Sequence, residues 1–234
     1  MDKQMNPIIN LHNVDCLPAM KEMADNQYDL CITDPPYGAD INYNTYEDTN
    51  DNWHRLMNVF IPEAIRVSKM IIMSSCGIGK LEWIYKNHPP DWLICWYKGS
   101  PGQFSKIGFN DWEALLVYGR TKNLSMHDYF YVRPDEKMGN HNHPCPKPIL
   151  WYKWLITRSL PNGGHVVDFF SGAGTGGIAC WDLGYDFTGY EIDKDYYNAS
   201  LKRLETHKKR PQCFFKEKDV FDPDKIRQRR KGIF

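Results

Sequence analysis

Residues 165–177 read HVVDFFSGAGTGG: an apolar strand, a glycine-rich turn and the first residues of a helix. Glycines in such a turn let a ligand approach the backbone, and the amino end of the helix offers free N–H groups. Glu191 closes the next predicted strand, where its carboxylate can accept hydrogen bonds from ribose hydroxyls. Ligands of open α/β sheets bind at this carboxyl edge, so the segment predicts a site for an adenosine-type molecule.

The same turn also matches the G-x-G-x-x-G pattern of dinucleotide-binding domains, through Gly172, Gly174 and Gly177. Only 57 residues follow Gly177, which is too few for the several strands that such a domain places after its fingerprint. The placement favours an adenosine-type ligand over NAD. An NAD-dependent oxidoreductase stays open as an alternative.

Strand-like and helix-like segments alternate along the chain, which is typical of an α/β domain with a mostly parallel sheet. The pattern predicts a single domain over residues 1–234 with seven strands, two of them in an antiparallel hairpin. Strands are expected at residues 8–11, 29–33, 70–74, 92–98, 113–119, 165–169 and 186–190. The main helices are expected at residues 17–23, 53–68, 149–160, 174–183 and 193–207.

A second segment with candidate chemistry, Asp34-Pro35-Pro36-Tyr37, directly follows one of these strands. Prolines supply no N–H donors, so the turn presents carbonyl oxygens and one carboxylate, which are acceptors for an NH2 group. The Asp34 carboxylate and the Pro35 carbonyl can hold both hydrogens of an exocyclic base amine and leave its lone pair free to attack. Tyr37 can stack on such a base once it is flipped out of a duplex. The alternative is a proline turn with a helix-capping aspartate.

Together the two segments resemble those of S-adenosylmethionine-dependent DNA amino-methyltransferases. Their order along the chain resembles the β class, in which the amine-binding motif precedes the cofactor motif. The DPPY tetrapeptide matches the family's catalytic motif, and residues 168–174 match its D-x-F-x-G-x-G cofactor loop. Residues 143–148 match the H-P-x-x-K-P segment that closes over the methionine end of the cofactor. The resemblance spans residues 8–205.

The resemblance implies a Rossmann-like methyltransferase fold with a circularly permuted strand order. The chain would begin at the family's third strand, continue to the seventh, and return last to the first and second. Asp34 and Asp168 would then end adjacent central strands, which places the target amine beside the sulfonium methyl group.

The resemblance also implies which residues form the site, with S-adenosyl-L-methionine as cofactor and no metal. The segment His141-x-His143-x-Cys145 contains residue types that bind zinc, but no fourth ligand is evident nearby. The implied catalytic residues are Asp34, Pro35, Pro36 and Tyr37. The implied cofactor-binding residues are Asp15, His143, Lys147, Asp168, Phe169, Phe170, Ser171, Gly172, Gly174, Thr175, Glu191 and Asp193.

The implied reaction is methylation of the N6 amine of a flipped adenine in double-stranded DNA. An aspartate at the start of the catalytic motif is more usual for adenine, whereas serine is more usual for cytosine. Methylation of cytosine N4 or of an RNA base are the alternatives within this chemistry. A nucleic-acid-binding subunit without activity is the alternative from another class, and a homodimer or a partner subunit is also open.

The composition is consistent with a globular, DNA-binding protein of the cytoplasm. Hydrophobic residues make up 42% of the chain, and the seven cysteines are never closer than 15 positions, which predicts reduced thiols. No apolar run is long enough to span a membrane. The net charge is zero, yet residues 202–234 contain 12 Lys+Arg and only 5 Asp+Glu. We therefore expect phosphate contacts from the basic tail, residues 208–234, and target recognition from a short insertion, residues 120–142.

Overall fold

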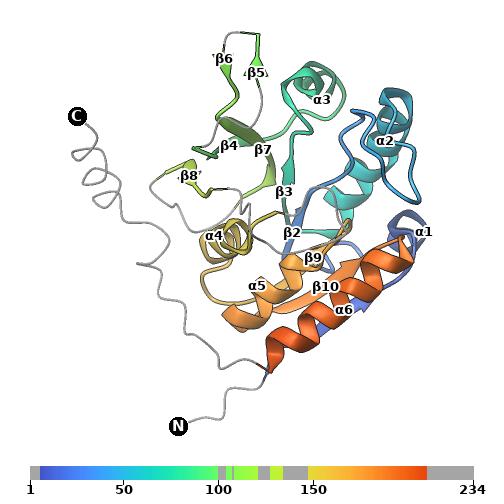
Figure 1. Ribbon diagram of the computed structural model, residues 1–234, viewed down its shortest axis with the longest axis vertical. Coiled ribbons are helices and arrows are strands. Elements are labelled where there is room, and N and C mark those ends of the chain that lie inside the picture. Colours follow the sequence, from blue (N-terminus) through green and yellow to red (C-terminus); the bar gives the residue numbers. More distant parts are fainter. Residues whose placement is uncertain (1–5, 100–103, 107, 121–126, 134–146, 210–234) are drawn as a thin grey trace, which may run out of the picture.

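A computed structural model describes residues 6–99, 104–106, 108–120, 127–133 and 147–209. Among these residues, eight strands form one sheet in the order β1-β10-β9-β2-β3-β7-β4-β8, and a two-stranded hairpin, β5–β6, extends from it (Figure 1). The strands of the sheet are β1 (Ile9–His12), β2 (Leu30–Thr33), β3 (Met70–Ser74), β4 (Trp92–Tyr97), β7 (Trp112–Gly119), β8 (Tyr129–Tyr131), β9 (His165–Asp168) and β10 (Asp186–Tyr190). The hairpin strands are β5 (Phe104–Ser105) and β6 (Gly108–Phe109).

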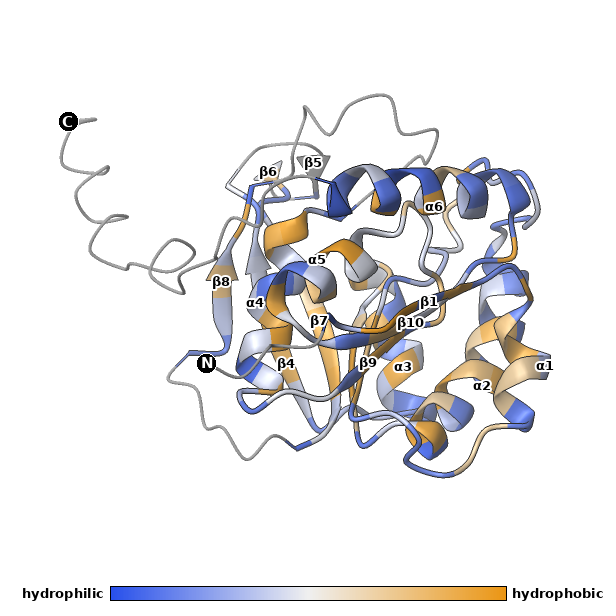
Figure 2. Cartoon of the chain, turned by 90° about the horizontal axis from the view of Figure 1, so that it is seen from below, coloured by the Kyte–Doolittle hydropathy of each residue, from blue (hydrophilic) through white to orange (hydrophobic). Residues whose placement is uncertain are grey.

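Helices cover both faces of the sheet (Figure 2). One face carries α1 (Cys16–Lys21), α2 (Asn50–Val67) and α3 (Leu81–Asn87), the last preceded by the short 3-10 helix η1 (Ile78–Lys80). The other face carries α4 (Ile149–Ser159), α5 (Thr175–Leu183) and α6 (Lys194–Lys208). Within the described ranges, no helix is both long and apolar enough to cross a membrane.

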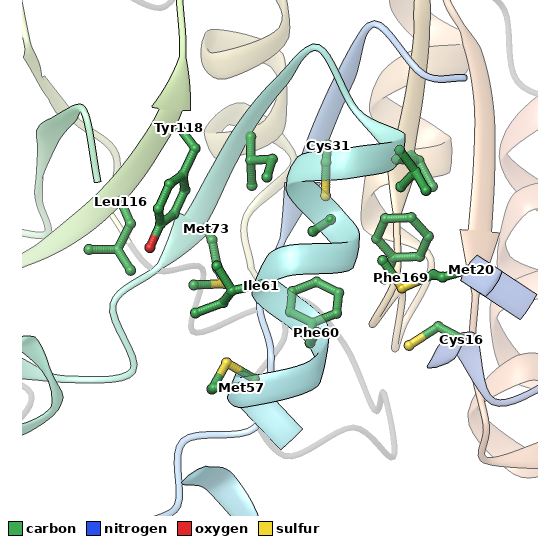
Figure 3. Packing of buried hydrophobic residues seen from close by; sticks show 14 of the residues in the cluster. Cys16, Met20, Cys31, Met57, Phe60, Ile61, Met73, Leu116, Tyr118 and Phe169 are labelled. Atoms are coloured by element: carbon green, nitrogen blue, oxygen red, sulfur yellow. The ribbon is translucent and has the colours of Figure 1, made fainter. Parts of the chain in front are cut away.

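The side chains of the central strands alternate between the two faces of the sheet, and this alternation produces a hydrophobic cluster on each face. In β3, Ile71 and Met73 pack with α2 in one cluster, whereas Met70 and Ile72 pack with α4 in the other. Because successive side chains of a strand point to opposite faces, an apolar run such as MIIMS suits a strand that is covered on both sides. Figure 3 shows the first cluster, in which Phe60 of α2 lies close to the sheet.

The sheet is mostly parallel, as predicted. Strands β1, β10, β9, β2 and β3 run in one direction, and β7 is antiparallel to both of its neighbours. The two strands that come late in the chain, β9 and β10, lie between the early strands β1 and β2. Consequently β2 and β9 are paired and parallel, and their carboxyl ends meet at the same edge of the sheet.

The prediction of seven strands was too low, because three short strands and α3 were not foreseen. Residues 129–131, expected within a target-recognition insertion, instead form β8, which pairs with β4. Phe130 is fully buried there and stacks on Trp154 with 4.3 Å between ring centroids. Helix α2 begins at Asn50, three residues before the predicted start, because the Thr49 side chain accepts a hydrogen bond from the Asn52 N–H group. The rest of the insertion, residues 121–126 and 134–142, and most of the tail lie outside the described residues.

Candidate active site

Three carboxylates follow one another along the carboxyl edge of the sheet. Asp168 is the last residue of β9, Asp34 follows β2, and Glu191 follows β10. These three strands are direct neighbours in the order β10-β9-β2. The fold thus brings together two segments that are separated by more than 130 residues, as the resemblance implied.

Asp34 is held by a tyrosine and a lysine. Its Oδ1 atom accepts a hydrogen bond from the Tyr37 hydroxyl at 2.8 Å, and its Oδ2 atom accepts one from Lys147 Nζ at 2.7 Å. The ammonium group of Lys147 also donates to the Tyr37 hydroxyl and lies 5.1 Å from the centre of that ring. A carboxylate oxygen has two lone pairs, so each oxygen of Asp34 can accept one further hydrogen bond, for example from an amine.

The turn after Asp34 is fixed by Gly38 and by Asp48, and the sequence patterns did not single out Asp48. Gly38 has a φ of 60°, and a Cβ atom there would come within 2.6 Å of the Trp53 Cβ atom, so only glycine fits. Buried Asp48 accepts hydrogen bonds from the N–H groups of Gly38, Ala39 and Ile41 at 2.6, 3.1 and 3.2 Å. The helix-capping alternative for Asp34 is wrong, because the next helix begins at Asn50 behind its own cap.

Asp168 is fully buried and accepts three hydrogen bonds from the protein. Its Oδ1 atom accepts hydrogen bonds from Thr33 Oγ1 at 2.8 Å and from the Phe170 N–H group at 3.1 Å. Its Oδ2 atom accepts one from the Tyr152 hydroxyl of α4 at 2.8 Å. Burial raises the pKa of Asp168 to about 7, against the opposing effect of these hydrogen bonds. The side chain therefore ties β9 to β2 and α4 and sets the start of the glycine-rich turn.

The glycine-rich turn leads directly into the amino end of α5. Gly172 and Gly174 have φ angles of 47° and 70°, and a Cβ atom at Gly174 would come within 2.7 Å of the Ser200 Cβ atom. Gly174 is also the N-cap of α5, and no side chain caps the helix there. Arg203 of α6 donates to Ala173 O and Thr175 Oγ1, both at 2.8 Å, and so holds the turn from its other side.

Glu191 lies against the same turn. Its Oε2 atom accepts a hydrogen bond from the Gly172 N–H group and its Oε1 atom one from the Asp193 N–H group, both at 2.8 Å. The residue is 9% exposed, and burial raises the pKa of its carboxyl group. Each of its oxygens keeps a lone pair for a further donor, such as a hydroxyl group.

Several residues expected to bind the cofactor have other partners. Phe169 is 2% exposed, and its ring lies in the core between Phe60 and Tyr190 (Figure 3). Asp193 accepts hydrogen bonds from the N–H groups of the first turn of α6, and Asp15 from the N–H group of Leu17 in α1. These carboxylates are helix caps, and a role of either side chain in binding the cofactor stays a prediction.

Of the remaining residues expected to bind the cofactor, Ser171 and Phe170 lie in the glycine-rich turn, and His143 lies outside the described residues. Ser171 is buried and its N–H group donates to Tyr190 O at 2.9 Å. Phe170 is half-buried with its ring 4.9 Å from that of Phe60. His143 and its neighbours 141–146, including the weighed zinc-ligand residues, lie outside the described residues. In the part of the chain that the structure describes, no group of three or more metal-ligating side chains occurs.

Three features of the site were missed from the sequence: the Lys147–Asp34 ion pair, the Tyr152 bond to Asp168 and the Arg203 clamp. Lys147 was expected only to bind the cofactor. Tyr152 carries a weak signal, since it follows the H-P-x-x-K-P segment in the first turn of α4. No sequence signal marks Arg203, because the polar helix α6 contains several other basic residues.

Comparison with known proteins identifies the family. The model of the N6/N4 DNA methylases, described as DNA methylase, matches residues 81–202, which is just over half of the 234 residues. The matched range includes Lys147, Asp168 and Glu191 but not Asp34. The chain is 25% identical to the type II methyltransferase M.HpaI of Haemophilus parainfluenzae over 227 residues, covering 81% of this chain and 72% of the other.

Solved structures share the fold. A complex of M1.HpyAVI with SAM superposes with a TM-score of 0.61 at 21% identity, over 84% of this chain and 99% of the other. The cytosine-N4-specific PvuII DNA methyltransferase also gives a TM-score of 0.61, at 13% identity, over 95% and 93% of the two chains. The family match settles the choice between the two readings of the glycine-rich turn against a dinucleotide enzyme. The chain therefore belongs to the N6/N4 family of S-adenosyl-L-methionine-dependent DNA methylases.

Proposed function

We propose that the protein methylates the N6 amine of adenine in double-stranded DNA, with the target base flipped into the site. The observation that carries the proposal is the pairing of β2 with β9. This pairing sets the acceptor turn at Asp34 beside the glycine-rich turn that follows Asp168. A base amine bound by one turn would then face a methyl group held by the other.

The residues on this edge suit the chemical groups of S-adenosyl-L-methionine. The cofactor carries a sulfonium and an ammonium cation, which favour a site that contains several carboxyl groups. Its ribose hydroxyls are donors for the remaining lone pairs of Glu191, and its carboxylate is an acceptor for the uncapped N–H groups at the start of α5. When bound, the cofactor supplies an electrophilic methyl group on sulfur.

The chain's own part in the reaction is to hold and orient the amine. Asp34 and the carbonyl of buried Pro35 would accept the two amine hydrogens, while Pro36 keeps the turn rigid. Tyr37 would stack on the base, with its hydroxyl fixed to Asp34. As the nitrogen becomes positively charged, the Asp34 carboxylate stabilises the transition state electrostatically.

Adenine is favoured over cytosine by the aspartate that begins the motif. The fold itself is compatible with both bases, since the PvuII enzyme that shares it is cytosine-N4-specific. The deciding experiment incubates the purified protein with DNA and isotope-labelled S-adenosyl-L-methionine, followed by nucleoside digestion and mass spectrometry. We expect label in N6-methyl-2′-deoxyadenosine; label in N4-methyl-2′-deoxycytidine would transfer the proposal to the other amine, and no label in either would reject it. An RNA substrate in parallel tests the remaining alternative.

Contacts to the DNA backbone are proposed for the basic tail, which lies mostly outside the described residues. Residues 224–234 contain five Lys+Arg and one Asp. Deleting them should weaken DNA binding and lower the slope of log affinity against log salt concentration by about 0.9 for each phosphate that the protein no longer neutralises. An unchanged slope would show that the tail makes no phosphate contacts.

A further inference from the structure

A series of hydrogen bonds leads away from the amine-binding turn across two neighbouring strands. The Tyr37 hydroxyl donates to Asp34 at 2.8 Å, and its oxygen is within reach of the Ser74 hydroxyl, which donates to it at 3.5 Å. Ser74 also donates to Glu113 Oε1 at 2.5 Å. Ser74 ends β3 and Glu113 is the second residue of β7, so the series follows the carboxyl edge from β2 to β7.

Ser74 and Glu113 are polar residues in strands that are otherwise apolar. All five residues of β3 (MIIMS) are buried, and β7 reads WEALLVYG with a half-buried glutamate. Burying a hydroxyl or a carboxylate costs free energy unless it is hydrogen-bonded, and here each group satisfies the other. Neither residue belongs to the amine-binding turn or to the glycine-rich turn.

The proposed reaction has a proton to dispose of. Transfer of a methyl group to an NH2 group leaves a positively charged nitrogen that must lose one proton. Asp34 is the nearest base, but its side chain is only 11% exposed, and a bound base would cover it further. A proton on Asp34 therefore needs a route to water that does not cross the substrate.

We propose that Glu113 is the outlet of a proton relay that begins at Asp34, an inference that rests on the proposed function. The N–H bond of the methylated amine breaks, and its proton binds Asp34. Asp34 passes a proton to the Tyr37 oxygen while Tyr37 passes its own proton to the Ser74 oxygen. Ser74 then passes its proton to Glu113, which releases it to solvent. Each oxygen gains and loses one bond to hydrogen, so Asp34, Tyr37 and Ser74 end as they began.

The surrounding groups allow this transfer. The Ser74 hydroxyl can donate to Glu113, the shortest contact of the series, and the Tyr37 hydroxyl turns from Asp34 to Ser74 as it takes up the proton of Asp34. Burial raises the pKa of Tyr37 well above its ordinary value, so Tyr37 stays protonated and carries a proton without holding a charge. Lys147 Nζ donates to both Asp34 and the Tyr37 hydroxyl, and so holds together the two groups of the first transfer.

Glu113→Gln tests the relay. Glutamine keeps the oxygen that accepts the hydrogen bond from Ser74, but its amide cannot take up the proton. We expect kcat over many turnovers to fall about tenfold or more, at the low end of what a proton-transfer group contributes. The KM values and the rate of methyl transfer in the first turnover, measured by rapid quench, should remain close to those of the wild type. The matched control is Glu82→Gln on α3, an exposed carboxylate paired with Lys86, which should leave kcat unchanged.

Chemical rescue separates a relay from a structural role. Formate added to Glu113→Ala should restore turnover, because it replaces the missing carboxylate, and should have no effect on Glu113→Gln. An unchanged kcat in Glu113→Gln would overturn the relay. The relay would also be overturned if the rate of methyl transfer fell equally in the first turnover and formate did not restore it. If the alanine variant does not fold, the glutamine variant decides alone. A wild-type protein that methylates no DNA base overturns the proposed function and the relay together, whereas active wild type with fully active Glu113→Gln overturns the relay only.

Discussion

Asp168 and Asp34 stand at the ends of two paired strands, yet their surroundings differ. Asp168 is fully buried and accepts hydrogen bonds from Thr33, Phe170 and Tyr152, all in fixed positions of the fold. Asp34 remains 11% exposed and is bound by the ends of two side chains, those of Tyr37 and Lys147. An aspartate thus has a structural role at the end of β9, whereas the aspartate after β2 can still accept hydrogen bonds from a ligand.

The difference separates a carboxylate that can take a further ligand from one that is held by the fold. A buried carboxylate with three donors from the protein has little capacity left for a ligand, and removing it disturbs the structure. A partly exposed carboxylate whose partners sit on long side chains can exchange them for a substrate amine. Substitutions should therefore separate loss of stability from loss of activity between the two strand ends.

Asp34→Ala should have the largest effect on activity. Without the carboxylate, the amine is no longer oriented and the developing charge is not stabilised, so methyl transfer should fall by about 10³-fold or more. Binding of S-adenosyl-L-methionine, measured by calorimetry, should change only a few-fold, because the glycine-rich turn is intact. Asp51→Ala, an exposed residue in the first turn of α2, is the control. Retained methyl transfer would contradict the role of Asp34.

Asp168→Ala should have the largest effect on stability. It leaves three donors in the interior without an acceptor, which should lower the free energy of unfolding by about 3 kcal/mol. Cofactor binding should be lost as well, because the turn that starts at Phe170 loses its anchor. Asp168→Asn keeps one acceptor oxygen and the volume of the side chain. Its free energy of unfolding, measured by urea denaturation, should therefore fall clearly less than that of Asp168→Ala. Equal losses in both variants would show that the hydrogen bonds are not what Asp168 contributes.

The stability of the protein should depend on pH through Asp168. Because burial raises the pKa of Asp168 from 3.8 to about 7, the folded protein keeps a proton that the unfolded chain has lost between these pH values. The contribution of Asp168 is thus complete below pH 4 and falls as pH rises to 7. In urea denaturation, the free energy of unfolding of the wild type should exceed that of Asp168→Asn most at pH 4. This excess should become smaller as the pH rises to 7. A difference that is independent of pH would mean that Asp168 titrates normally.

Tyr152→Phe should have the smallest effect. It removes one of the three donors to Asp168 and leaves the ring in place, so the free energy of unfolding should fall by about 1 kcal/mol. Methyl transfer should stay within a few-fold of the wild type, because Asp34 is untouched. A thermal melt together with an activity assay gives both values. A loss of activity comparable to that of Asp34→Ala would contradict the assignment of a purely structural role to Asp168 and its partners.

Much of the site could be predicted, but not which way each side chain points. The motifs at Asp34 and Asp168 led to the correct pair of strand ends, whereas Phe169 was assigned to the cofactor and lies in the core. Asp15 and Asp193 were assigned to the cofactor from the resemblance, which gave no sign that each also caps a helix. Alternation and capping are local effects, and they decide whether a residue next to a motif faces the ligand.

The short elements escaped prediction for a related reason. β8 has three residues and each strand of the β5–β6 hairpin has two, which is too few to show a period of alternation. β8 exists because it pairs with β4 and buries Phe130 against Trp154, and these contacts are made by the fold as a whole.

The sequence by itself determined the α/β class, the order of the main elements and the two motifs, because periodicity, glycine and proline act within a few residues. Only the tertiary structure decided that Lys147 binds Asp34, that Thr33 and Tyr152 bind Asp168, and that Ser74 meets Glu113. The Lys147–Asp34 and Thr33–Asp168 partners are 113 and 135 residues apart. Hydrogen bonds between such distant residues depend on which strands become neighbours, and no local pattern of residues encodes that.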